Sequence, residues 1–124
     1  MTTPVSLSFA AVNIDCVDAA ALAGFWGEAL GRPVSPGKVP GDMAVEATGP
    51  ESGPRMIFHT VSELGTANNR FRPILLTEVY HEEIERLTGL GATPVNEIKL
   101  PEVRWTAFTD PEGNEFDLVT WQPA

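Results

Sequence analysis

The sequence predicts an α+β fold in which two βαβββ repeats form a cupped mixed sheet with the helices on its convex side. The first observation is a Leu-Gly dipeptide that ends a predicted helix at Gly31 and recurs, sixty residues later, at Gly91. The second is that the predicted elements follow the same order around both dipeptides. The third is a tight turn at residues 110–114, which leads into an alternating strand. We therefore expect one domain with repeat halves 5–62 and 68–121.

Composition limits the classes of function. The chain has 124 residues, of which 43% are hydrophobic, so we expect a single globular core. Its net charge of −9 argues against binding of nucleic acid. No apolar run is long enough to span a membrane, and residues 1–6 lack the features of a secretory signal. Cys16 is the only cysteine, which excludes an intramolecular disulfide and favours a cytoplasmic location.

The first half is predicted to begin with a strand and a helix. Residues 8–16 alternate in the manner of a strand, and Asp18 stands where a helix N-cap belongs. An apolar stripe at helical spacing runs through residues 22–30. A Pro/Gly-rich loop is expected at 35–41.

Strands at 43–48 and 55–61 complete this half, separated by a turn at 49–54. Residues 62–69 are a polar linker to the second half.

The second half repeats this order. A strand is predicted at residues 70–76, followed by Thr77 as N-cap and a helix that ends at Gly91. Three more strands are predicted at 95–100, 104–109 and 115–119.

Alternation along the first and last strands divides their side chains between two faces. The helices must pack against the apolar set, which is Val12, Ile14, Phe116 and Leu118. The other set points into the cup and comprises Ala11, Asn13, Asp15, Glu115 and Asp117. Polar side chains on an inward face indicate a binding site.

The chain resembles the vicinal oxygen chelate superfamily, which includes glyoxalase I, bleomycin resistance proteins and extradiol dioxygenases, and in particular its small glyoxalase-like domains. The resemblance covers nearly the whole chain. The matching segments are residues 12–18, 25–31, 69–71, 82–87, 90–94, 104–106 and 110–116. The Asp-Pro-Glu-Gly-Asn-Glu-Phe segment is the most specific of them. The resemblance implies a fold and leaves the reaction open.

Catalytic members of this superfamily hold a divalent metal ion with four ligands, and the resemblance places their positions in this chain. The first falls on Ala11, the third on Arg72 and the last on Asp117. The second falls within residues 55–59, where only His59 could serve. Because an alanine cannot ligate and an arginine repels a divalent cation, we predict no metal ligands and no cofactor. A divalent metal remains the minority alternative.

Arg72 and Asp117 stand at positions that face each other in the catalytic relatives, so an ion pair is expected in place of the metal. One interpretation is structural: a buried salt bridge that fills a lost site. In the other, Arg72 recognises a ligand while Asp15, Glu115 or Asp117 acts as a base. The structural interpretation is favoured.

Several other side chains have both a structural and a functional interpretation. His59 is either a half-buried strand histidine or a ligand-binding group. Trp105 either packs in the core, which is the favoured interpretation, or lines the cup, where its indole offers a stacking surface to a ligand. Asn13 is a further ligand-binding candidate. Cys16 and Trp26 are expected to be packing residues.

Three functions stay open. The first is a metal-free protein that binds a small organic molecule for sequestration or transport, as the resemblance to bleomycin resistance proteins implies. The second is a metal-independent enzyme of the lyase or isomerase type that uses Asp15, Glu115 or Asp117. The third is a metalloenzyme of the glyoxalase or dioxygenase type. The resemblance also implies a homodimer, and neither a nucleic acid nor a membrane is an expected partner.

Overall fold

The computed structural model describes residues 9–49, 51–62 and 72–121 and contains the predicted duplication. The first half comprises β1 (Ala11–Cys16), α1 (Ala19–Leu30), β2 (Val34–Pro36), β3 (Met43–Val45) and β4 (Arg55–Thr60). The second half comprises β5 (Ile74–Leu76), α2 (Tyr80–Leu90), β6 (Thr93–Lys99), β7 (Val103–Thr109) and β8 (Glu115–Trp121). The predicted α+β class and the order of elements are confirmed.

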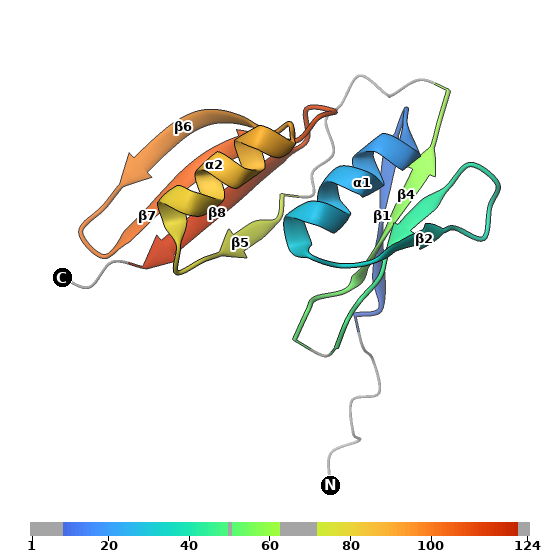
Figure 1. Ribbon diagram of the computed structural model, residues 1–124, viewed down its shortest axis with the longest axis horizontal. Helices are drawn as coiled ribbons and strands as arrows, with labels where there is room; N and C mark the ends of the chain where they lie inside the picture. Colours follow the sequence, from blue (N-terminus) through green and yellow to red (C-terminus); the bar gives the residue numbers. More distant parts are fainter. Residues whose placement is uncertain (1–8, 50, 63–71, 122–124) are drawn as a thin grey trace, which may run out of the picture.

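Each half folds into its own four-stranded sheet, with strand orders β1-β4-β3-β2 and β5-β8-β7-β6. The first strand of each half pairs in parallel with the last, and the other pairs are antiparallel. Both helices lie on the same side of the two sheets (Figure 1). The opposite side of each sheet, which we call its open face, carries no helix of the described residues.

The hydrophobic core lies between the helices and the sheets and is shared by both halves. Phe116 of β8 is at its centre, with its ring centroid 5.0 Å from that of Trp26 and 5.2 Å from that of Phe108. Cys16 and Trp26 are buried in this core, as predicted. Aromatic packing across the two halves therefore makes them one hydrophobic unit.

Helix ends follow local chemistry, with one exception. Asp18 is the N-cap of α1 and accepts a hydrogen bond from the backbone N–H of Ala21 at 3.1 Å, as predicted. Both helices end at the predicted glycines, which adopt left-handed conformations that favour glycine. The prediction for Thr77 is wrong: the N-cap of α2 is Val79, and the Thr77 hydroxyl accepts a hydrogen bond from its N–H.

Three predicted strands differ in extent. β2 lies partly within the expected loop at 35–41, where pairing with β3 outweighs the poor strand propensity of Pro36. β3 stops at Val45 rather than residue 48. β5 begins at Ile74, and residues 70 and 71 of the predicted strand lie outside the described residues.

The second half holds both ends of α1. The Glu112 carboxylate accepts hydrogen bonds from the backbone N–H groups of Val17 and Asp18, both at 2.9 Å. At the other end, the Arg86 guanidinium donates to the carbonyls of Glu28 and Ala29 at 2.9 and 2.7 Å. An anion at the N-terminus and a cation at the C-terminus both stabilise the helix dipole.

Candidate functional site

A cavity of about 430 Å³ lies on the open face of the first sheet. Its lining includes Asn13 and Asp15 from β1, Arg55, Ile57 and His59 from β4, and Lys38 and Asp42 from the loop between β2 and β3.

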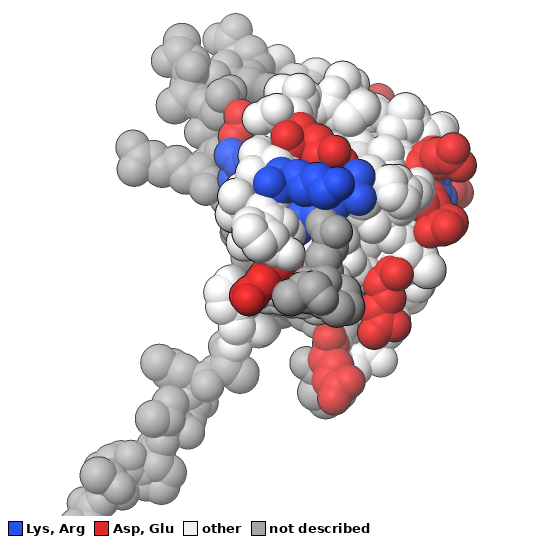
Figure 2. Space-filling model, turned by 90° about the vertical axis from the view of Figure 1, so that its left-hand side faces the viewer, with Lys and Arg blue, Asp and Glu red and all other residues white. Residues whose placement is uncertain are grey.

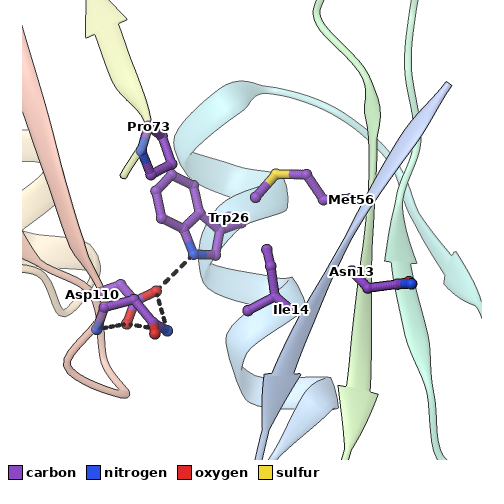
Figure 3. Close-up of a pocket in the computed structure, with 7 residues that line it drawn as sticks. Asn13, Ile14, Trp26, Met56, Pro73 and Asp110 are labelled. Atoms are coloured by element: carbon purple, nitrogen blue, oxygen red, sulfur yellow. Dashed lines mark hydrogen bonds between the residues drawn. The ribbon is translucent and has the colours of Figure 1, made fainter. Parts of the chain in front are cut away.

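Strand register explains why these side chains share a face. In the parallel β1–β4 ladder, Asn13 lies opposite Ile57 and Asp15 lies opposite His59. Paired residues project to the same side, and the intervening Ile14 and Phe58 are buried under α1. Figure 3 shows Asn13 and Ile14 projecting from opposite sides of β1. The predicted orientation of this strand is confirmed.

His59 forms an ion pair with Asp42 at the edge of the cavity. Its Nδ1 lies 2.9 and 3.1 Å from the two carboxylate oxygens, and the backbone N–H of Thr60 donates to the same carboxylate at 3.1 Å. The Asp42 side chain is 6% exposed, whereas that of His59 is 46% exposed. The hydrogen bond to Asp42 raises the pKa of His59, and the hydrogen bonds from His59 and the Thr60 N–H lower the pKa of Asp42.

The loop that carries Asp42 is closed by backbone hydrogen bonds. The Gly37 N–H donates to the Asp42 carbonyl at 2.9 Å, and the Thr60 hydroxyl donates to the Gly41 carbonyl at 2.7 Å. A Cβ atom at Gly37 would lie 2.8 Å from the Cβ of Asp42, so the loop requires glycine there. Sequence reasoning missed Asp42. The glycines around it were the available signal for a tight loop.

The two basic side chains of the cavity differ in their partners. Arg55 forms an ion pair with Glu46, its Nε lying 2.8 Å from Oε1. Arg55 and a short hydrogen bond from Ser35 lower the pKa of Glu46. Lys38, by contrast, forms no ion pair within the described part of the chain.

On the open face of the second sheet, Arg72 forms the predicted ion pair with Asp117. Its Nε and one terminal nitrogen lie 3.0 and 2.9 Å from the two oxygens of Asp117, and its other terminal nitrogen lies 2.9 Å from Glu115. The Arg72 side chain is 45% exposed, so the interpretation as a buried salt bridge is wrong. The pair stands at the surface because none of the helices and strands in the described part of the chain covers this face.

Trp105 lies on the same open face as this ion pair. It stands opposite Val119 on β8 and Ile98 on β6, whereas its neighbour Thr106 is buried on the helix side. The favoured interpretation of Trp105 as a core residue is therefore wrong, and its ligand-binding role stays a prediction.

The four superfamily metal positions do not fit a metal ion. The second position lies within residues 55–59, where His59 stays the predicted candidate, and its Nδ1 already faces the Asp42 carboxylate. At the other three positions, Ala11, Arg72 and the engaged Asp117 do not supply the donors that Zn²⁺, Mn²⁺ or Fe²⁺ requires. Across residues 9–49, 51–62 and 72–121, no group of three or more His, Cys, Asp or Glu side chains is placed to hold a metal ion.

A second, much smaller cavity lies where the two halves meet. It measures about 20 Å³ and is bordered by Trp26, Met56, Pro73 and Asp110. The indole N–H of Trp26 donates to Asp110 at 2.9 Å beside it (Figure 3). Such a space holds about one water molecule and no organic ligand. Nearby, burial raises the pKa of the Cys16 thiol to about 12, so it is an inert packing group.

The molecular surface carries many acidic side chains, as the net charge of −9 leads one to expect. Figure 2 shows acidic side chains spread over one face of the molecule, where they border a central group of basic ones. No helix in the described ranges is long and apolar enough to cross a membrane.

Comparison with known proteins assigns a family. The glyoxalase-like domain family profile matches residues 11–119. No functionally curated protein matches the chain significantly.

Solved structures share the fold at low sequence identity. A glyoxalase/bleomycin resistance protein/dioxygenase family enzyme from Burkholderia phytofirmans superposes with a TM-score of 0.75 at 16% identity, over 94% of this chain and 100% of that one. A hypothetical protein from S. aureus gives 0.71 at 15% identity, over 94% and 95% of the two chains. A glyoxalase/bleomycin resistance protein from Albidiferax ferrireducens gives 0.66 at 14% identity, over 93% and 98%. With the profile match across both halves, these similarities show that the chain belongs to the glyoxalase-like domain family of the vicinal oxygen chelate superfamily.

Proposed function

We propose that the protein binds a small organic molecule in the cavity on the open face of the first sheet, without a metal ion. The observation that supports this most is the volume of about 430 Å³, which is typical of small-molecule sites. Polar groups from three separate segments converge on the cavity around the half-buried side chain of Ile57. A ligand with an apolar body and hydrogen-bonding groups at its edge suits such a lining.

The absence of a metal in this proposal rests on donor chemistry at the superfamily positions. Arg72 carries a permanent positive charge there, and Ala11 has no donor atom. Metal analysis of the purified protein tests this point: we expect far less than one Zn, Ni, Mn or Fe per chain. A stoichiometric ion that survives dialysis would instead support the metalloenzyme alternative.

A blocked cavity provides the direct test of binding. Ile57→Trp places an indole inside the cavity, whereas Leu100→Trp adds the same group at an exposed position of the second half. A panel of small aromatic cations and metabolites is screened by amide chemical shifts. We expect shifts at Asn13, Ile57 and His59 in the wild type and in Leu100→Trp, and none in Ile57→Trp. Shifts that map only to the second sheet, or none with any compound, would contradict the proposal.

A second candidate function is a metal-independent enzyme of the lyase or isomerase type. The His59–Asp42 pair in the cavity favours it, because a histidine oriented by a carboxylate is a common proton-transfer group. Of the three carboxylates predicted as bases, Glu115 and Asp117 are both engaged by Arg72. Asp15, on the cavity face, is the remaining candidate. Product analysis of any ligand that binds distinguishes turnover from sequestration.

We also propose that the protein is a homodimer. The open face of the second sheet carries large apolar side chains, and Ile74, Leu76 and Trp121 are 72%, 66% and 66% exposed. Register places all three on that face. An apolar surface of this kind is stabilised by a partner, and a second copy is the partner that the family resemblance implies.

A further inference from the structure

We propose that a second small-molecule site lies at the seam between the two repeats, beside the helices, and that it takes a small organic cation with an ammonium group on a compact apolar body. This site is separate from the cavity on the open face of the first sheet. The inference therefore goes beyond the proposed function.

The site is a cavity of about 400 Å³, close in volume to the cavity on the first sheet. Both repeats contribute to its walls. The first repeat provides the end of α1 and two residues of the loop between β3 and β4, and the second provides β5, α2 and β8. Figure 1 shows β5 between α1 and α2. A volume of this size is typical of sites for small organic molecules.

Leucine side chains form the buried part of the cavity wall. Leu75 lies opposite Leu118 in the β5–β8 ladder, and Leu118 and Leu87 are 2% and 1% exposed. Leu30, at the end of α1, is half-buried and packs against the same core. A ligand that places an apolar body over these leucines removes apolar surface from water, which favours binding.

The charged side chains of the lining are acidic. Glu51 and Glu83 line the cavity, and none of the described residues that line it is Lys, Arg or His. Glu83 is already neutralised, because its two carboxylate oxygens both lie 2.8 Å from nitrogens of Arg86. The nearby Arg32 guanidinium is buried and donates to four backbone carbonyls. Glu51 forms no ion pair within the described part of the chain, so it is the anion available to a bound cation.

The free edge of β5 adds hydrogen-bond acceptors. β5 is the outermost strand of its sheet, and the Pro73 carbonyl and the Thr77 N–H pair with β8. Alternation along the strand directs the carbonyls of Ile74 and Leu76 away from β8, and both residues line the cavity. An ammonium group has three N–H donors for such acceptors, whereas a carboxylate has none. Acidic charge, free carbonyls and an apolar wall together favour a cationic ligand with an apolar body.

Three probes with one apolar body test the charge preference: cyclohexylammonium, cyclohexanol and cyclohexanecarboxylate, each titrated at neutral pH and followed by amide chemical shifts. We expect saturable shifts at Leu30, Leu75 and Thr77 with the ammonium probe. The alcohol should bind about tenfold more weakly, and the carboxylate should give no saturable shift. Equal affinities for the three probes, or no saturable shift at these amides up to the solubility limit, would overturn the proposal.

Charge reversal at Glu51 tests the assigned anion. Glu51→Lys should lower the affinity for cyclohexylammonium by about tenfold, and Glu51→Gln by about threefold, because the carboxylate is exposed and partly screened. Glu102→Lys changes the net charge by the same amount at an exposed position between β6 and β7 and should leave the affinity unchanged. Equal losses in the two Lys variants would show attraction by net charge alone and refute the site.

The location of the shifts separates this site from the cavity of the first sheet. If cyclohexylammonium shifts the amides of Asn13 and Ile57 but not those of Leu30 and Leu75, the first cavity binds the cation and this inference fails. If the probe shifts Leu30 and Leu75 while the ligand panel leaves Asn13 and Ile57 unchanged, this inference stands and the proposed function fails. If neither set of amides responds to any compound, both fail.

Discussion

The two sheets have the same topology but different open faces. The first carries a cavity with polar side chains, including the His59–Asp42 pair. The second carries an ion pair centred on Arg72 and a set of exposed apolar residues. Strand order alone therefore does not decide the chemical character of an open face. The identity of the alternate residues on each strand does, because a period of two exposes a different set on each face.

The largest expected effect is on the free energy of unfolding and concerns Asp110, which links the two halves through its hydrogen bond to Trp26. Asp110 is 4% exposed and accepts hydrogen bonds from the Trp26 indole, two backbone N–H groups and the Asn114 amide. Asp110→Ala should lower the free energy of unfolding by about 3 kcal/mol, because buried donors lose a charged acceptor. Urea denaturation monitored by tryptophan fluorescence and circular dichroism measures this change.

Asp117→Ala is the matched control for that variant, since it removes a carboxylate from the following strand. Its ion pair with Arg72 is partly exposed, so we expect a loss below about 1 kcal/mol. Equal losses in the two variants would contradict the expectation that the buried Asp110 carboxylate contributes more to stability than the partly exposed ion pair of Asp117.

The next prediction concerns the apolar residues of the second open face. Trp121→Glu places a charge among them and should raise the dissociation constant of the dimer by about 10²-fold. Leu100→Glu changes an exposed apolar residue outside β6 and β7 and serves as the control. Sedimentation at several micromolar concentrations measures both. A wild-type protein that is monomeric throughout would refute the proposed dimer.

Removal of Arg72 tests whether the open face of the second sheet contributes to ligand binding. Arg72→Leu leaves Glu115 and Asp117 without their shared partner, which should cost about 1 kcal/mol or less at this exposed site. Ligand affinity of the first cavity should stay the same within about twofold. A ligand that binds the wild type but not Arg72→Leu would move the binding site to the second face.

The smallest expected effect is a pH dependence confined to the first face. The folded pKa of His59 is raised above its ordinary 6.5, so the stability it contributes is complete below that value and is lost as the pH rises through the folded pKa. The folded pKa of Asp42 is lowered, so its contribution is lost only as the pH falls below its ordinary 3.8 and through the folded value. Unfolding free energy should therefore decline above about pH 6.5 in the wild type but not in His59→Gln. An unchanged slope in the variant would show that the pair does not stabilise the fold.

The fold could be predicted because its determinants are local. The Asp18 N-cap, the glycines after both helices and the turn at residues 110–114 each fix a boundary through the chemistry of a few adjacent residues. β2 escaped prediction because a three-residue strand that ends in a proline is held by its neighbour rather than by its own propensity.

The residues that strands contribute to the candidate site could be predicted from the sequence, whereas those that loops contribute could not. Alternation along β1 and β8 placed Asn13, Asp15 and Asp117 on the open faces, because that pattern is visible in the sequence. Asp42 was missed, since a loop closure brings it to His59 from seventeen residues away. The role of Glu112 was missed for the same reason: its partners at Val17 and Asp18 lie in the other half.

Because α1 is held at both ends by residues of the second repeat, the two repeats depend on each other for stability. The first repeat contains the helix, but Glu112 and Arg86, which complete its ends, belong to the second. A fragment cut after β4 would leave those amides and carbonyls to solvent, together with the apolar surface that Phe116 covers. A chimera that exchanges one repeat with a relative should therefore carry an acid and a guanidinium at matching positions to keep both ends of α1 satisfied.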